Sequence, residues 1–234
     1  MSDWEVDVNS PEAVEFAEMA RDLTGEAGVN ETLSKVIEYA KEFTGSEDGG
    51  VALLGAERKL EAARSSDERA GRADTLQDAL REGPVVNAAR THKTYLVRDI
   101  ASDGRWPRWG PLVVDLGLHS VVSTCLYTER HTIGTLNVYS SEPGALSEED
   151  AENIQVFASH AAVAIESAQE GDGLRRAIET RNVIGQAQGL LMERYGLDAR
   201  RAFDVLRRYS QETNTKLRTV AERLVYERRL PDGE

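Results

Sequence analysis

The chain has 234 residues, 40% of them hydrophobic and 29% charged, which is the composition of a globular protein with one large domain or two small ones. No run of about 18 apolar residues occurs, and the acidic N-terminus lacks the basic start and apolar core of a signal peptide. The single cysteine, Cys125, cannot form an internal disulfide. We therefore expect a cytoplasmic protein without a membrane segment.

The net charge of −13 is unevenly distributed along the chain. Residues 174–230 contain 13 Lys and Arg but only 7 Asp and Glu, a local net charge of +6, whereas residues 1–173 carry −17. An acidic segment joined to a basic one indicates polyanion binding at the basic end. A basic helical surface that is merely solvated gives the same pattern, so charge alone leaves both interpretations open.

The first half of the chain begins with helical periodicity and then changes to strand periodicity. Ser10-Pro11 predicts a helix start, because Ser caps free N–H groups and Pro fits the first turn, and a second helix begins at Asn30 and ends at Gly45. The expected strands are 51–54, 60–64, 94–97, 120–127 and 133–139, and the expected short helices and turns are 74–81, 85–89 and 112–116. The last two strands form a hairpin. The predicted fold class is α+β, with helices packed on a sheet.

Helical periodicity returns at Ser147, which caps a long helix predicted to end near Ala168. The step Glu170-Gly171-Asp172-Gly173 then indicates a domain boundary or a flexible joint. The predicted domains are a helical N-terminal segment at 1–29, a sheet-based domain at 30–170, an all-helical domain at 171–230 and a tail at 231–234.

Several short motifs in residues 30–168 carry a resemblance to a known family. They are Leu80-Arg81-Glu82-Gly83-Pro84-Val85, Val97-Arg98-Asp99-Ile100, Asp103-x-Arg105-Trp106-Pro107, Gly117-x-x-Ser120-Val121-Val122-Ser123, Ile133-Gly134-x-Leu136-Asn137-Val138-Tyr139-Ser140 and His160-Ala161-Ala162-Val163-Ala164-Ile165. Together they closely resemble GAF domains of actinobacterial regulators. The resemblance implies a sensor built on an antiparallel sheet, with a small-molecule or cofactor pocket on one face and dimerisation through flanking helices.

The residues of this domain do not identify its signal, and none of them predicts catalysis. The Asn-Lys-x-Phe-Asp-Glu signature of cyclic-nucleotide-binding GAF domains is absent. The four histidines show no metal-ligand spacing, and one cysteine leaves no resolving partner for the methionine sulfoxide chemistry of some GAF proteins. We expect Cys125 to be a buried thiol rather than a redox sensor, and we expect no enzyme activity, cofactor or metal. Trp106 and Trp109 either line a pocket or pack in a loop.

Helical patterns continue in the C-terminal segment. The positions 174, 177, 181, 184, 188 and 191 have the alternating three–four spacing of a coiled-coil seam, which Arg181 and Gln188 interrupt. Gly196 is placed for a left-handed helix cap, Asp198 begins a second helix, and Asn214 or Thr215 begins a third. Three short helices cannot each bury a face alone, so a compact three-helix bundle is expected.

The motifs of this bundle are Arg181-x-x-Ile184-x-x-Ala187-x-Gly189-x-Leu191-Met192, Ala202-Phe203-x-x-Leu206-Arg207-x-x-Ser210 and Lys216-Leu217-x-x-Val220-Ala221. They resemble the ANTAR domain, the RNA-binding module of bacterial antitermination regulators, over residues 174–226. The resemblance implies that a dimer binds RNA carrying two small stem-loops and favours an antiterminator over a terminator. The family commonly has a lysine in place of Gln188.

Arginine and lysine bind phosphates, and single-stranded bases are recognised by hydrogen bonds and stacking. The predicted phosphate contacts are Arg181, Arg194, Arg207, Lys216 and Arg218, and the predicted base or sugar contacts are Gln188 and Ser210. We expect a homodimer in which an unknown small-molecule signal at the GAF domain alters the dimer and thereby RNA binding. The alternatives are a small-molecule-binding GAF protein whose C-terminal bundle only dimerises it, and a DNA-binding regulator that uses a helix-turn-helix.

Overall fold

The computed structural model describes residues 19, 21–23, 28–55 and 59–227. The chain divides into two compact units, Met1–Glu170 and Gly171–Glu234. The helix start predicted at Ser10 and the tail predicted at 231–234 lie outside the described residues. Within the described residues, no helix has both the length and the apolar character that a bilayer-spanning segment needs.

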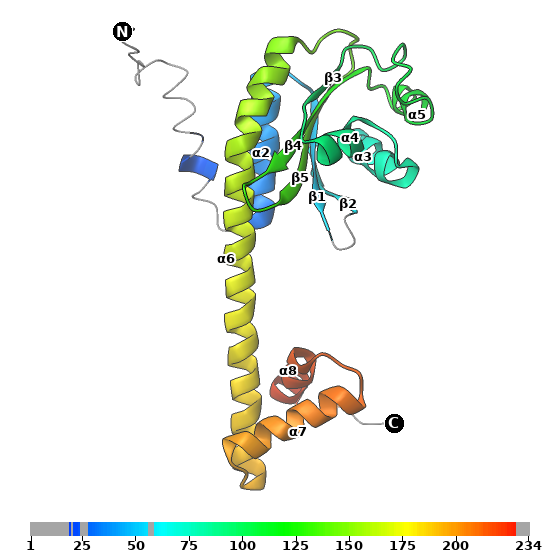
Figure 1. Cartoon of the computed structure of the whole chain (residues 1–234). Coiled ribbons are helices and arrows are strands. Elements are labelled where there is room, and N and C mark those ends of the chain that lie inside the picture. Colours follow the sequence, from blue (N-terminus) through cyan, green and yellow to red (C-terminus); the bar gives the residue numbers. More distant parts are fainter. Residues whose placement is uncertain (1–18, 20, 24–27, 56–58, 228–234) are drawn as a thin grey trace, which may run out of the picture. The chain divides into compact units, whose positions relative to one another are not determined.

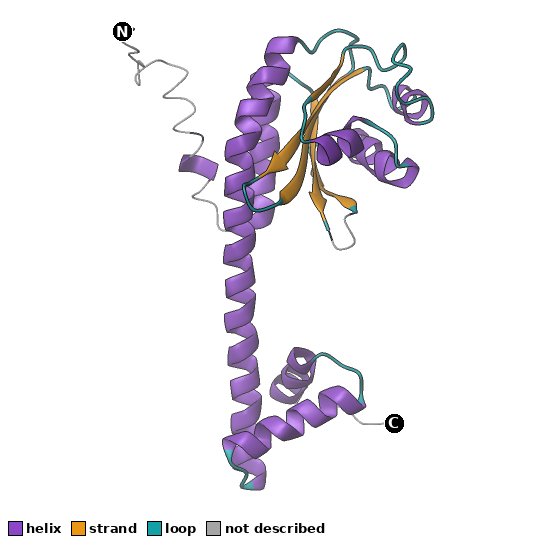
Figure 2. Ribbon diagram, viewed as in Figure 1, coloured by secondary structure: helices purple, strands orange, loops and turns teal. Residues whose placement is uncertain are grey.

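The first unit is built on a five-stranded sheet in which each pair of neighbouring strands is antiparallel. The strands are β1 (Asp48–Leu54), β2 (Leu60–Ser65), β3 (Tyr95–Val97), β4 (Ser120–Tyr127) and β5 (Thr132–Ser140). They lie in the order β2-β1-β5-β4-β3. Figure 2 shows the strands of this sheet in orange and the helices in purple. β4 and β5 form the predicted hairpin, with Ser120 opposite Ser140. The predicted α+β fold class is confirmed.

One face of the sheet is covered by α2 (Val29–Thr44) and by the first part of α6 (Glu148–Tyr195) (Figure 1). The apolar residues of α2 recur at helical spacing, and Leu33 and Val36 are buried against the sheet. Leu136 of β5 belongs to the same apolar cluster, because alternate side chains of a strand point to one face.

The other face carries α3 (Glu68–Leu80), α4 (Pro84–Thr91) and α5 (Trp109–Val114) (Figure 1). A second apolar cluster on this face takes side chains from α3 and α5. Trp109 is fully buried, and its indole Nε1 donates a hydrogen bond of 3.2 Å to a backbone carbonyl of α3. Trp106 is also buried and packs edge-on against Trp109. Both indoles therefore belong to the core rather than to an open pocket.

Two helices on this face are longer than predicted. α3 begins at Glu68 rather than at 74, because the carboxylate of Asp67 caps it by accepting a hydrogen bond of 2.7 Å from the amide of Arg69. α4 is a complete helix where a short turn was predicted at 85–89. Pro84 stands in its first turn, where a proline has no helical N–H bond to lose.

α6 starts at the predicted cap but runs much further than predicted. Ser147 and Asp150 bond reciprocally: the hydroxyl of Ser147 accepts from the amide of Asp150 at 3.1 Å, and the amide of Ser147 donates to the carboxylate of Asp150 at 2.7 Å. The helix end predicted near Ala168 is wrong, since Gly171 and Gly173 lie inside α6. A helical glycine costs only about 1 kcal/mol relative to alanine, which does not interrupt a helix favoured by its other residues.

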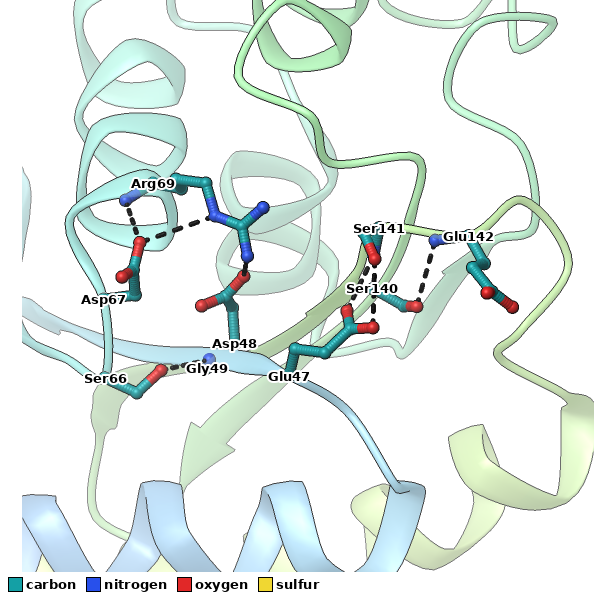
Figure 3. A network of polar contacts seen from close by, with 9 residues as sticks. All are labelled: Glu47, Asp48, Gly49, Ser66, Asp67, Arg69, Ser140, Ser141 and Glu142. Atoms are coloured by element: carbon teal, nitrogen blue, oxygen red, sulfur yellow. Dashed lines mark hydrogen bonds and ion pairs between the residues drawn. The ribbon is translucent and has the colours of Figure 1, made fainter.

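A polar network joins the start of β1 to α3 and to the end of β5 (Figure 3). The carboxylate of Asp48 accepts a hydrogen bond of 2.6 Å from the guanidinium of Arg69, although burial raises the pKa of Asp48. The carboxylate of Glu47 accepts hydrogen bonds of 2.8 and 3.0 Å from the amide and hydroxyl of Ser141, which lower its pKa. Both carboxylates already have partners, so we assign this network a structural role.

The second unit contains the last part of α6 together with α7 (Ala199–Glu212) and α8 (Leu217–Glu227). Its apolar core takes side chains from all three helices: Val183, Ala187, Leu191, Ala202, Leu206, Val220, Ala221 and Leu224. Gly196, with a φ of 63°, follows α6 as predicted. Asp198 caps α7 by accepting a hydrogen bond of 2.8 Å from the amide of Arg201. The predicted all-helical second domain is therefore present.

Candidate functional site

A groove in the second unit contains two of the seven residues predicted to contact RNA. It has a volume of about 560 Å³ and is lined by Arg176, Ala177, Thr180, Arg181, Ile184, Gln188 and Phe203. The lining residues from α6 recur at three- and four-residue intervals and share one side of the helix. The half-buried Ile184 and Phe203 give the groove an apolar inner surface, whereas the exposed Arg176 and Arg181 place guanidinium groups beside it. The groove thus combines positive charge with an aromatic ring.

Gln188 contributes an acceptor to this groove. Its Nε2 donates a hydrogen bond of 3.0 Å to the carbonyl of Ala199, at the start of α7. A carbonyl only accepts, so the contact fixes the orientation of the amide. Among the described residues, Oε1 of Gln188 and the guanidinium of Arg181 have no hydrogen-bond partner, and both are available to a ligand.

Arg218 lies next to the groove but is held by carboxylates. Its guanidinium lies 2.7 Å from the carboxylate of Glu222 and 3.6 Å from that of Glu179, and its hydrogen bond to Glu222 raises its pKa. It also donates a hydrogen bond of 3.4 Å to the hydroxyl of Thr180, which lines the groove. Because exposed ion pairs are weak, a phosphate could replace either carboxylate.

The other predicted cations do not line the groove. Arg207 pairs with Asp204 at 2.9 Å on α7. Arg194 lies near the end of α6, with its guanidinium 5.8 Å from the ring centre of Tyr195. Lys216 is exposed immediately before α8. These three side chains lie at separate places on the bundle. Their role as phosphate contacts stays a prediction.

Ser210 has a role inside the bundle. Its hydroxyl donates a hydrogen bond of 2.6 Å to the carbonyl of Thr215, which connects the end of α7 to the turn before α8. The hydroxyl hydrogen is therefore already used, and Ser210 could meet RNA only through its oxygen as an acceptor.

Arg176 and Phe203 line the groove but are not among the seven predicted RNA contacts. The four-residue spacing of Arg176, Thr180 and Ile184 could have indicated their shared side of α6. The pattern of α7 alone does not show that Phe203 reaches α6, because that contact depends on how two helices pack.

In the first unit, polar side chains of β4 and β5 are buried on the face of the sheet that carries α3 and α4. Alternate positions of β4 and β5 point to this side, and they include Ser123, Thr135, Asn137 and Tyr139. The carboxylate of Asp74 on α3 accepts a hydrogen bond of 2.6 Å from the hydroxyl of Tyr139 and bonds of 3.2 Å from the amide of Asn137. Burial raises the pKa of Asp74 to about 6, although both donors act to lower it.

Ser123, Thr135 and Asn137 form what we term the buried polar row. The hydroxyls of Ser123 and Thr135 and the side-chain oxygen of Asn137 are buried without a hydrogen-bond partner among the described residues. An unpaired buried polar group costs about 1–3 kcal/mol, so such groups are uncommon in folded proteins. Ser123 lies directly opposite Asn137 across the two strands. The buried polar row is therefore the candidate signal site of the first unit.

Cys125 lies on the same side of β4 and is buried, as expected. Burial raises the pKa of its thiol to about 11, which keeps it protonated and unreactive. In the part of the chain that the structure describes, no three His, Cys, Asp or Glu side chains are grouped as metal ligands.

Comparison with protein-family models finds two domains in the chain. The GAF domain model matches residues 26–166, more than half of the chain, and the ANTAR domain model matches residues 172–225. The buried polar row lies within the first match, and the groove lies within the second. A search of curated proteins gave no significant match.

Solved structures share the fold of the sheet-based unit. The GAF domain of an Acinetobacter phosphoenolpyruvate-protein phosphotransferase aligns with 69% of this chain and 96% of its own, at 12% identity and a TM-score of 0.53. The free methionine-R-sulfoxide reductase of Neisseria meningitidis, in complex with its substrate, aligns over 69% and 94%, at 17% identity and a TM-score of 0.51. A bacteriophytochrome of the photosynthetic bacterium R. palustris matches 79% of this chain at 13% identity and a TM-score of 0.56, and the chain spans 43% of that protein.

At these identities the structural likeness shows the fold alone. The five-stranded antiparallel sheet with its flanking helices is the GAF fold, and the helical unit that follows coincides with the ANTAR match. The chain therefore belongs to the GAF domain family and, with its ANTAR domain, is a GAF and ANTAR domain-containing regulator.

Proposed function

We propose that this protein promotes transcription antitermination: its ANTAR domain binds paired stem-loops in nascent RNA, and its GAF domain controls that binding. The two domains support an RNA partner and a small-molecule signal. The observation that carries the proposal is the groove between α6 and α7, which Arg176 and Arg181 line together with Phe203.

The chemistry of the groove favours a single-stranded loop over a duplex. The net charge of +6 in residues 174–230 attracts any nucleic acid, because phosphates are common to RNA and DNA. An aromatic ring, in contrast, is useful only to a base that is not already stacked in a helix. A groove lined by Phe203, Arg176 and Arg181 therefore fits the exposed bases and phosphates of a hairpin loop.

The proposal includes a homodimer formed through what we term the apolar α6 face, which consists of Leu174, Ile178, Gly185 and Met192. Leu174, Ile178 and Met192 are 68%, 60% and 37% exposed, and a Cβ at Gly185 would meet nothing within 4 Å. At about 100° per residue, the four positions fall within a sector of roughly 40°. Leu191 is instead buried in its own bundle, so the predicted heptad seam is only partly open. A second copy would remove the apolar α6 face from water.

Control by the GAF domain would act through the hairpin of β4 and β5. The hydroxyl of Thr128 donates to the carboxylate of Glu166 at 3.5 Å, and Nδ1 of His131 lies 3.6 Å from it. The guanidinium of Arg130 donates to the carboxylate of Glu170 at 3.1 Å. The turn of this hairpin is thereby tied to α6 within the first unit. A small polar molecule at the buried polar row would act on the same two strands.

We propose a regulatory rather than a catalytic role. Cys125 is the only cysteine of the chain, and its raised pKa keeps the buried thiol protonated. Reduction of methionine sulfoxide by cysteine requires an accessible thiolate and a thiol that resolves the intermediate. The chain provides neither.

Binding of the full chain to a two-hairpin RNA and to duplex DNA, measured across salt concentrations, tests the proposal. We expect a preference for the hairpins and a slope of about −3.5 in the log–log plot, since five contacts each contribute ~0.7 on single strands. A terminator template should show more read-through when the protein is added. Preference for duplex DNA would support the helix-turn-helix alternative, and binding to neither would support a bundle that only dimerises.

A further inference from the structure

We propose that the groove between α6 and α7 holds one unpaired nucleobase of an RNA loop, stacked on the ring of Phe203. The adjoining phosphates lie at Arg176 and Arg181. The inference rests on the proposed function and specifies which part of the RNA this groove takes. It assigns Phe203 a direct role in recognition.

The form and lining of the groove fit a planar, weakly polar ring with a charged backbone. Its volume of about 560 Å³ is bounded by the apolar side chains of Ala177, Ile184 and Phe203. Stacking of a base on an aromatic side chain is a principal contact between proteins and single-stranded nucleic acids. The base would cover the apolar surface, while its phosphates remain near the exposed guanidinium groups.

α7 surrounds Phe203 with further positive charge. Arg200 precedes it by three residues and Arg207 follows it by four, so all three side chains lie on one side of the helix. Arg200 and Arg207 are both exposed. A strand whose base enters the groove would therefore find cations on both sides of Phe203.

A second copy of the chain is a poorer occupant of this groove. In a symmetric contact, Arg176 and Arg181 of both chains would face one another, and the residues that line the groove include no carboxylate. Like charges in contact disfavour such an interface. The apolar α6 face contains no charged residue and, at about 100° per residue, is centred roughly 95° around the helix from the α6 residues that line the groove, so it suits a second copy better.

Gln188 gives the groove a group that can read a base edge. Its Nε2 already donates to the carbonyl of Ala199, so Oε1 is the atom that a ligand meets. This oxygen would accept a hydrogen bond from the exocyclic amino group of adenine, guanine or cytosine. Uracil has no amino group and would have to donate its N3–H instead, so Oε1 selects for a hydrogen-bond donor on the edge of the base.

The test uses the full chain and a two-hairpin RNA that carries 2-aminopurine at one loop position at a time. Fluorescence of this base falls when it stacks on an aromatic ring. We expect binding to quench one loop position, and we expect Phe203→Tyr to keep that quenching. Phe203→Leu keeps an apolar side chain but removes the ring, so it should abolish the quenching and weaken binding by about tenfold or more.

Two charge variants separate stacking from phosphate binding. Arg181→Ala should weaken binding but preserve quenching in the complex that forms. Arg223→Ala removes an exposed cation of α8 that does not line the groove, and it should leave the quenching unchanged. Circular dichroism verifies that Phe203→Leu is folded. As a readout that needs no variant, ultraviolet crosslinking of the wild-type complex should join the quenched nucleotide to the α7 peptide.

Three results would overturn the inference and leave the proposed function intact: RNA binding without a quenched position, quenching that survives Phe203→Leu, or a crosslink elsewhere. If Phe203→Leu dissociates the dimer while quenching persists, a second copy occupies the groove instead of a base. If the wild-type chain binds no hairpin RNA at all, the proposed function itself fails.

Discussion

The hydroxyl of Tyr139 donates a hydrogen bond of 2.6 Å to the carboxylate of Asp74, and both groups are buried between the sheet and α3. No cation pairs with Asp74 among the described residues. Burial raises the pKa of Asp74 from 3.8 to about 6, and burial together with the charge of Asp74 raises the pKa of Tyr139. The carboxyl of Asp74 therefore exchanges its proton close to neutral pH.

This buried carboxyl should make the first unit less stable as the pH rises. The folded state binds the proton more tightly than the unfolded state, whose carboxyl titrates near 3.8. The stabilising contribution of the protonated Asp74 carboxyl is fully present below about pH 4 and is lost as the pH rises through about 6. The pKa of Asp74 is raised by a little more than two units, and each unit corresponds to about 1.4 kcal/mol. The contribution of Asp74 to the free energy of unfolding therefore changes by roughly 3 kcal/mol over this pH range. Asp74→Asn should thus gain stability relative to the wild type between pH 4 and pH 7.

Urea unfolding followed by tryptophan fluorescence measures this difference, because all three tryptophans lie in residues 1–170. The free energy of unfolding of the wild type is subtracted from that of the variant at each pH. This removes the contributions of other titrating groups such as Glu47, whose lowered pKa acts in the opposite direction. Asp78→Asn, at a half-buried position of the same helix, is the control: it shows how much an Asp-to-Asn substitution changes stability without the buried carboxyl. A difference between Asp74→Asn and wild type that does not vary with pH would contradict the prediction.

Cys125 should resist alkylation in the folded protein. Its pKa, raised from 9.0 to about 11 by burial, leaves about a hundredfold less thiolate than an ordinary cysteine has at neutral pH. Its side chain is also nearly inaccessible. Mass spectrometry after treatment with iodoacetamide should detect a modified Cys125 only when denaturant is present. Rapid labelling of the native protein would revive the redox-sensor interpretation.

Local periodicity was sufficient to predict the strands and most helices, because alternation and helical spacing are properties of one segment. Ser120–Tyr127 and Thr132–Ser140 agree closely with prediction. The end of α6 was missed because Gly171 and Gly173 carry a cost that the rest of the helix outweighs. A sequence shows where single residues weaken a helix. Whether the helix ends there depends on the summed helix-forming free energy of all its residues.

The candidate sites were harder to predict because each joins distant segments. Asn137 and Asp74 are 63 residues apart in the chain, and neither strand nor helix periodicity pairs them. Arg181 and Gln188 were found because a seven-residue spacing places them on one side of α6. Phe203 joins them only through the packing of α7 on α6, which no single segment reveals.

The apolar α6 face predicts a dimer that a charge should break. Ile178→Asp places a carboxylate on this face, and its burial against a second copy would be costly. Because Ile178 is 60% exposed in the single chain, the bundle itself should remain folded. Sedimentation should show a dimer for the wild type and a monomer for this variant at micromolar concentration.

Tyr226→Asp is the matched control for the dimer, since Tyr226 is a large apolar residue of the same unit and is 77% exposed on α8. It should leave the sedimentation unchanged. A wild-type monomer at all concentrations, or equal effects of the two substitutions, would mean that the apolar α6 face does not hold the dimer.

Gly171 and Gly173, two of the four glycines inside α6, should be replaceable by alanine with a gain in stability. A Cβ at Gly173 would meet nothing within 4 Å, and at Gly171 it would meet only a guanidinium nitrogen of Arg175 at 3.9 Å. Each exchange should stabilise the helix by about 0.5–1 kcal/mol, because glycine loses more backbone freedom on folding. Thermal unfolding followed by circular dichroism should therefore shift to higher temperature in the double variant.

The same variant distinguishes a continuous helix from a flexible joint. If α6 is already helical through both glycines, hairpin RNA should bind the double alanine variant as tightly as it binds the wild type. Gly144→Ala offers an opposite control: Gly144 has a φ of +74°, so alanine there is strained and should destabilise the first unit. A double variant that melts lower than the wild type would show that the chain at Gly171 and Gly173 needs a conformation other than the helix.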